Sequence, residues 1–294
     1  MASDEHLVLA KSVLQTVLSR FQNYSQYLSA VCGPSALTAS QAMNVIQNYT
    51  SPLKIKQKDQ LKIQYKRTLS VPFAITGHTL FIRLPFPKLT SSHVLAMCDH
   101  EIGTHFLRSL NQSKQSLKSR SLRDELGLSE VLAFDTEEGL ATLHTVINNQ
   151  VKILFKPALH YYACCMAEKL PFVDLYHHLA NYMDKVDDCW EETVRLKRGV
   201  PAQACGVYAK DQVYFRGAIK VLRHRRVINW KLLYSCRVAL EDLYKIEQHV
   251  DLNKVVLPAF LKDEQKYLDR LDDVVEQNGL FESVGYGDLP LPYG

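Results

Sequence analysis

The spacing of hydrophobic positions changes from helical to strand-like within the first 85 residues. Hydrophobic side chains recur mostly every three or four residues over 4–31, which predicts one long amphipathic helix capped by Ser3 or Asp4. A shorter helix is predicted over 39–48. Hydrophobic and polar residues then alternate in LKIQYKRTLSVPF and ITGHTLFIRLP, which predicts a pair of antiparallel strands within 60–85.

The rest of the chain is predicted to be helical. The segment TSSHVLAMCDHEIGTHFLRSLN starts a helix at Thr90 or Ser91, and EEGLATLH starts another near Thr136. We therefore predict one domain of class α+β, mainly α, without an internal linker. Its predicted parts, in chain order, are N-terminal helices (1–50), a small sheet (60–85), two helices with the candidate chemistry (90–145) and a helical C-terminal part (150–280).

Composition and charge are those of an ordinary globular protein. The 294 residues are 47% hydrophobic and 22% charged, with a formal net charge of +4. Seven cysteines without a CxxC pair predict reduced thiols, and neither a signal peptide nor a long apolar run is found, so we expect a cytoplasmic protein without a membrane partner. Basic runs at 54–67, 195–198 and 223–226 suit an acidic partner, or are simply solvated faces.

The segment HEIGTH carries the candidate chemistry. A zinc hydrolase holds its ion with imidazoles and a carboxylate. His100 and His105 are five residues apart, which in a regular α-helix would turn them roughly 140° away from each other. A π-bulge over 102–104, eased by Gly103, would bring both to one side. Glu138 is the candidate third ligand, in a first helical turn where the dipole favours negative charge. The alternative is that His100 and His105 are ordinary helix residues, and that Glu137 and Glu138 merely place negative charge at a helix N-terminus.

Neighbouring residues supply further candidate roles. Glu101 lies between the two histidines and is the candidate general base. Asp99 and Glu137 are candidate partners for the imidazole N–H groups. His144 is predicted either to support the metal ligands or to be structural, and His177 and His178 are predicted to be structural.

HEIGTHFLR followed by TEEGLA resembles the microtubule-associated tyrosine carboxypeptidases and the broader QEGLA-motif family. The resemblance extends over about 40–250 and includes KDQVYFRG. It implies a helical zincin-like metallopeptidase domain, with a small antiparallel sheet before the active-site helix, that removes the C-terminal tyrosine of α-tubulin. It also implies one Zn²⁺ held by His100, His105 and Glu138, with Glu101 as the base.

A carboxypeptidase must also bind the free carboxylate of its substrate, and cationic side chains are suited to this. Tyr214 is a candidate oxyanion donor or substrate contact, and Lys210 or Arg216 a candidate carboxylate anchor. The alternative is a core tyrosine with surface cations. Arg83 is a rival anchor, on the predicted strand 78–84 that could pair with the substrate backbone.

Three hypotheses about function remain open at this point. The first is a zinc carboxypeptidase acting on the acidic tail of α-tubulin, in the cytoplasm and associated with the cytoskeleton. The second is a zinc peptidase of the same fold with a different peptide substrate. The third is a non-catalytic, metal-containing module that binds acidic polymers, although the general base at Glu101 favours an enzyme. Nucleic acid is the weakest partner, because few aromatic residues accompany the basic runs. The basic N-terminal extension of the resembling microtubule-associated enzymes has no counterpart before the first predicted helix.

Overall fold

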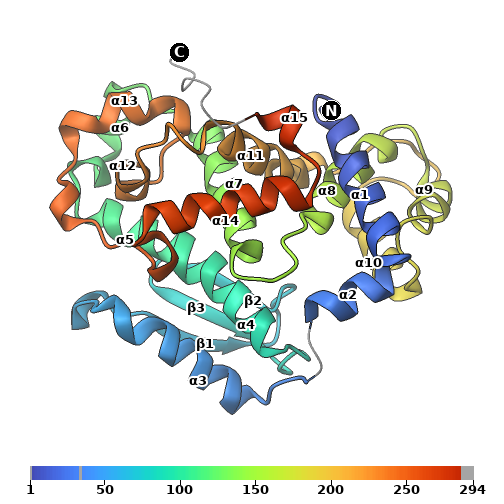
Figure 1. Cartoon of the computed structure of the whole chain (residues 1–294), viewed down its shortest axis with the longest axis horizontal. Helices are drawn as coiled ribbons and strands as arrows, with labels where there is room; N and C mark the ends of the chain where they lie inside the picture. Colours follow the sequence, from blue (N-terminus) through green and yellow to red (C-terminus); the bar gives the residue numbers. More distant parts are fainter. Residues whose placement is uncertain (1, 33–34, 286–294) are drawn as a thin grey trace.

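The computed structural model describes residues 2–32 and 35–285, and these residues form a mainly helical structure with one small sheet (Figure 1). The predicted α+β, mainly α class is confirmed. A π-helix, η3 (Cys98–Phe106), connects two α-helices in the middle of the molecule. The α-helices are α1 (Leu7–Phe21), α2 (Tyr24–Cys32), α3 (Ala39–Thr50), α4 (Ser91–Met97), α5 (Leu107–Ser113), α6 (Arg120–Glu125), α7 (Glu130–Ile147), α8 (Phe155–Ala167), α9 (Phe172–Leu179), α10 (Val186–Leu196), α11 (Gln212–His224), α12 (Trp230–Ser235), α13 (Leu243–Ile246), α14 (Glu264–Gln277) and α15 (Phe281–Val284). Residues 1, 33–34 and 286–294 of the predicted single domain lie outside the described residues.

The predicted N-terminal helix is two helices, α1 and α2. Gln22 ends the first in a left-handed conformation, with φ of 65°, and the Asn23 side chain accepts a hydrogen bond from the Gln26 N–H at the start of the second. The prediction of one helix over 4–31 was wrong because both helices keep the hydrophobic spacing across this break. Neither predicted cap is used, since His6 precedes the first helical residue of α1.

The small sheet has three strands, β1 (Lys62–Lys66), β2 (Phe73–Thr76) and β3 (Thr79–Arg83), in the order β1-β3-β2. β2 and β3 form an antiparallel hairpin with a turn at Gly77, whose φ of 57° suits glycine. β1 pairs with β3 in parallel. The predicted antiparallel pair was therefore wrong: the turn lies inside the second predicted strand, and the resulting sheet is mixed.

Two glycines allow α7 and α11 to cross almost in contact. A Cβ added at Gly217 would lie 1.9 Å from the carbonyl oxygen of Asp135, and one at Gly139 would lie 2.2 Å from the carbonyl carbon of Gly217. These are the glycines of the EEGLA and VYFRG segments. Their lack of a side chain fixes the distance between the two helices.

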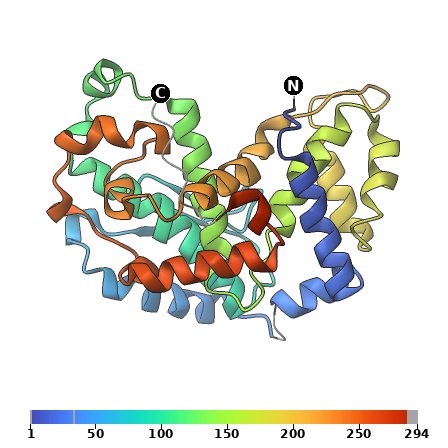
Figure 2. The same cartoon turned by 45° about the horizontal axis from the view of Figure 1, so that its top comes forward.

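Helices lie on both sides of the small sheet and form most of the rest of the molecule (Figure 1). Figure 1 shows the sheet at one edge of the molecule, between α3 and the helices above it. Figure 2 shows α1 lying against the group formed by α8, α9 and α10 at one end. Among the described helices, none combines the length and the apolar character needed to cross a bilayer.

Candidate metal centre and active-site cavity

The π-helix brings the two histidines of HEIGTH together. η3 runs from Cys98 to Phe106, so the predicted widening is confirmed and extends beyond 102–104. The ring centroids of His100 and His105 are 5.0 Å apart, because in a π-helix residues five apart lie above one another.

Gly103 is needed in this helix for packing. A Cβ at this position would lie 2.5 Å from the Tyr49 hydroxyl oxygen and 2.9 Å from the Phe260 ring. The predicted role, easing a backbone distortion, is thus accompanied by a second one: glycine lets α3 and the segment around Phe260 close over the π-helix.

Hydrogen bonds orient both imidazoles with Nε2 free. The Thr145 hydroxyl donates to the Ala141 carbonyl at 2.9 Å, so it accepts from His100 Nδ1, also at 2.9 Å. His105 Nδ1 donates to Glu137 Oε1 at 2.8 Å. Each ring therefore carries its proton on Nδ1 and presents the Nε2 lone pair, the form that binds a metal.

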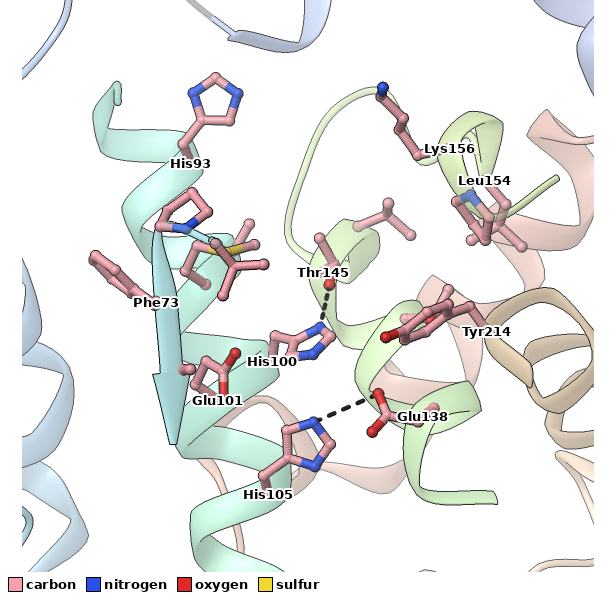
Figure 3. A pocket seen from close by; sticks show the side chains of 18 of the residues that line it. Phe73, His93, His100, Glu101, His105, Glu138, Thr145, Leu154, Lys156 and Tyr214 are labelled. Atoms are coloured by element: carbon pink, nitrogen blue, oxygen red, sulfur yellow. Dashed lines mark hydrogen bonds and ion pairs between the residues drawn. The ribbon is translucent and has the colours of Figure 1, made fainter. Parts of the chain in front are cut away.

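Glu138 completes the candidate triad from α7. Figure 3 shows His100, Glu101 and His105 projecting from the π-helix, with Glu138 facing them across the cavity. His105 Nε2 lies 3.8 Å from Glu138 Oε2. The prediction that Glu138 lies in a first helical turn was wrong, because Ser129 caps α7 and the helix starts at Glu130. Glu138 lies in the middle of α7, next to Gly139 at the α7–α11 crossing.

The donor set of this triad fits zinc. Among the described residues, His100, His105 and Glu138 each offer one ligand atom, and these atoms lie within 4.8 Å of one another. Bonds of about 2.1 Å in tetrahedral geometry place ligand atoms about 3.4 Å apart, so small side-chain rotations would close the site. Two imidazoles and one carboxylate leave the fourth position open, which is the arrangement of catalytic rather than structural zinc.

Glu101 is a buried carboxyl group beside the triad and the β2 strand. Burial raises its pKa to about 7; the nearby His105 and a hydrogen bond from the Ile75 backbone N–H act in the opposite direction. A carboxyl group with a pKa near neutrality can both accept and return a proton.

A buried ion pair, which sequence reasoning missed, supports His105. Arg108 is fully buried and pairs with Glu137, the carboxylate that accepts from His105. Burial alone would raise the pKa of Glu137, but Arg108, His105 and Arg237 together lower it to about 2. The remaining Arg108 donors bind backbone carbonyl groups at 233, 236 and 238. The available signal was HFLR, which places an arginine three residues after His105 on the same helical face.

Asp99 and His144 form hydrogen bonds that connect η3 to other elements. Asp99 accepts hydrogen bonds from the Tyr49 hydroxyl and the Asn148 amide, both at 2.7 Å, in place of the predicted imidazole. His144 is fully buried between Thr104 and Tyr267 and links the π-helix to α14, in agreement with a structural role.

A cavity of about 810 Å³ opens in front of the triad. Its lining includes the site residues on η3 and α7, the β2 strand, and side chains of α2, α8, α10 and α11. β2 is an edge strand, whereas β3 is paired on both sides. The predicted substrate-pairing strand 78–84 therefore cannot accept a peptide, and the free edge in the cavity belongs to β2.

The structure brings only one of the four predicted substrate residues into this cavity. Tyr214 lines it, and burial together with the negative charge of Glu138 raises the Tyr214 pKa to about 12. The other three lie outside the lining. Arg216 forms a two-pronged ion pair with Asp135, Lys210 lies 5.2 Å from the Phe134 ring centre and Arg83 donates to the Ser70 carbonyl. The cationic side chains that do line the cavity are Lys156, Arg195 and Arg237.

The basic runs differ in their surroundings. Residues 54–67 are mostly exposed, on the turn around Gln57–Asp59 and on β1. In the other two runs Lys197 and Arg225 are buried, and Arg225 and Arg226 both pair with Asp272. Only the first run forms a solvated basic face.

Known proteins are similar to this chain over nearly its whole length. The family model described as microtubule-associated tyrosine carboxypeptidase matches residues 5–279. The microtubule-associated tyrosine carboxypeptidase 1 proteins of rat and human are 31% and 29% identical over 96% of this chain, and the mouse putative tyrosine carboxypeptidase MATCAP2 is 27% identical over 96%. The chain spans 60% of the length of the rat and human relatives and 54% of the mouse relative. The chain thus belongs to the microtubule-associated tyrosine carboxypeptidase family.

Proposed function

We propose that this protein is a zinc-dependent carboxypeptidase that removes the C-terminal tyrosine from the acidic tail of α-tubulin, in the cytoplasm and in association with microtubules. The observation that carries the proposal is the convergence of His100, His105 and Glu138 beside the buried carboxyl group of Glu101. The family to which the chain belongs supports the reaction and the substrate class.

The residues of the chain have separable roles in this reaction. His100, His105 and Glu138 would hold the zinc ion, which when bound supplies a Lewis acid for the scissile carbonyl and its attacking water. Glu101 accepts the proton of that water and returns it to the leaving amine. Tyr214 lines the opposite cavity wall (Figure 3), and in this proposal it donates a hydrogen bond to the developing oxyanion or to the substrate.

The free edge of β2 supports an extended peptide as substrate. Pro72 accepts a hydrogen bond from the Arg83 N–H, so alternate residues from Pro72 onward face β3. Phe73 and Ile75 therefore turn their backbone groups toward the cavity, and the Ile75 N–H already reaches Glu101. A peptide that adds a strand here would bring its carbonyl groups past the triad.

The charge distribution supports an acidic chain upstream of the cleaved residue. The exposed basic face of 54–67 and the half-exposed Arg237 of the cavity lining attract carboxylates. Binding of an acidic peptide is expected to weaken as ionic strength rises.

Two alternatives make different predictions. A zinc peptidase with another substrate would share the metal site and Glu101 but would not favour an acidic peptide ending in tyrosine. A non-catalytic metal module would bind acidic polymers with Glu101 dispensable. A buried carboxyl group within reach of an open coordination position favours an enzyme.

The test is mass spectrometry of an acidic peptide ending in Glu-Glu-Tyr, incubated with wild-type protein, Glu101→Gln and the matched control Glu130→Gln, an exposed glutamate on α7. We expect loss of one tyrosine with wild type and control, a rate at least about 100-fold lower with Glu101→Gln, and no cleavage after chelation. An intact peptide with zinc-loaded wild type would contradict the proposed substrate, and full activity of Glu101→Gln would contradict the proposed base.

A further inference from the structure

One wall of the cavity carries a second polar cluster, separate from the metal triad. It consists of His160 on α8, Arg195 on α10 and their acidic partners Glu192 and Asp211. His160 Nδ1 is 2.5 Å from Glu192 Oε1, and Arg195 Nε is 2.6 Å from Asp211 Oδ2. Both acids and His160 are buried, and His160 and the partly exposed Arg195 line the cavity.

Each buried acid binds only one nitrogen of its cationic partner. Glu192 binds Nδ1 of His160, and the described residues give Nε2 no hydrogen-bond partner. Asp211 binds Nε of Arg195, and no hydrogen bond from the two Nη groups is found to any described residue. The Arg195 side chain is 38% exposed. Paired with the buried carboxylate of Glu192, His160 in its imidazolium form carries a proton on both ring nitrogens, so its Nε2–H and the Nη groups of Arg195 can donate to a ligand in the cavity.

The position of Tyr214 connects this cluster to the metal triad. Figure 3 shows Tyr214 between Glu138 and Lys156, on the wall that faces His100. Its ring centroid is 6.5 Å from that of His160. The negative charges of Glu138 and Asp211 both act on its hydroxyl, in addition to burial. The cluster therefore lies about one side chain beyond the triad.

We infer that His160 and Arg195 form the subsite that binds the free α-carboxylate of the substrate, one residue beyond the scissile bond. The inference rests on the proposed peptidase function. A planar guanidinium with two free Nη groups matches a carboxylate, and a second donor from imidazole Nε2 fixes its orientation. Lys156, exposed at the same wall, adds positive charge at the entrance.

This subsite determines which peptides are substrates. A C-terminal carboxylate held here sets a fixed distance to the triad, so cleavage releases one residue at a time. A peptide with a C-terminal amide has no charge to offer, and a longer peptide that passes through the cavity would leave the two bases without a carboxylate. The enzyme would consequently act as an exopeptidase on free C-termini and not as an endopeptidase.

The experiment compares two peptides that both end in Glu-Glu-Tyr, one with a free carboxylate and one with a C-terminal amide. Binding of fluorescein-labelled forms is measured by anisotropy on zinc-loaded Glu101→Gln protein, which keeps the cavity but does not consume the peptide. The same measurement is made after adding Arg195→Gln or His160→Gln, and after adding Arg198→Gln as the control. Arg198 lies three residues further along the chain, stacked on Tyr208 and outside the cavity lining. Thermal unfolding verifies that each variant is folded.

We expect the free acid to bind about 10- to 100-fold more tightly than the amide, the range expected for charge-assisted hydrogen bonds. Arg195→Gln should remove most of this preference, His160→Gln part of it, and Arg198→Gln none. Equal binding of acid and amide, or an undiminished preference in both cavity variants, would overturn the inference. Because binding is measured without turnover, a failure of peptide cleavage by the wild type would count against the proposed reaction and not against this subsite.

Discussion

The close crossing of α7 and α11 makes Gly217→Ala a direct test of how the metal ligands are positioned. The new methyl group would lie 1.9 Å from the Asp135 carbonyl oxygen. Carbon and carbonyl oxygen are normally about 3.3 Å apart at closest approach. The two helices must therefore separate locally by about 1.4 Å, because the obstructing atom is backbone and cannot rotate away.

Two measurable effects follow from this separation. Overpacking of this kind costs about 1–3 kcal/mol in the free energy of unfolding. Glu138 lies next to Gly139 at the crossing, and zinc–ligand distances tolerate only about 0.2 Å. A displacement of more than 1 Å at this ligand is expected to lower zinc affinity by at least about 10-fold.

The assay combines urea unfolding with a zinc titration against a competing chelator. Arg223→Ala is the control, since it also leaves an alanine on α11, but at a partly exposed position where only a 3.9 Å contact with Glu5 is lost, with an expected change within about 0.5 kcal/mol. A Gly217→Ala variant with the same free energy of unfolding as wild type would refute the packing argument. Lost stability with unchanged zinc affinity would refute the link between the helix crossing and the ligand position.

Three further predictions concern buried charges. Lys197→Met removes an ammonium group that donates to the carbonyls of residues 167, 170, 204 and 206, and it should lower the free energy of unfolding by about 2–4 kcal/mol in urea unfolding. Arg108→Met leaves Glu137 buried without its main cationic partner and should cost about 3–5 kcal/mol in the same assay, with a reduced zinc content. Burial acts to raise the pKa of Glu192, but the contact with His160 outweighs burial and leaves this pKa lower than its ordinary value of 4.5. The resulting stabilisation is fully present above the ordinary pKa, so Glu192→Gln should be less stable than wild type at pH 7, and the difference should shrink as the pH falls below 4.5 and through the lowered pKa.

Local signals were sufficient to predict the π-helix. Because they are five residues apart, His100 and His105 can bind the same metal ion only if the helix is widened. Gly103 marks the position where this helix packs closely against its neighbours. The mainly helical class followed similarly from hydrophobic spacing. Where spacing continued through a break, as at Gln22, the prediction was wrong, because periodicity does not report backbone dihedral angles.

The walls of the cavity could not be predicted in the same way. Arg195 and His160 carry no local signal, and Arg195 reaches the cavity only because α10 and α11 pack against α8. In the sequence, Arg216 and Lys210 were equally suitable as carboxylate anchors. In the structure, Arg216 is paired with Asp135 and Lys210 lies over the Phe134 ring. Which cation is free to bind a ligand depends on tertiary contacts among distant segments.

The free edge of β2 also implies selection by conformation. The strand is four residues long, about 13 Å, and its outward groups can be matched only by a chain whose own backbone donors and acceptors are not yet satisfied. A C-terminus folded into a helix or docked on its own domain offers no such groups. A C-terminus that is not cleaved would then be one that is folded or docked. Any event that releases this terminus from its own structure would make it a substrate.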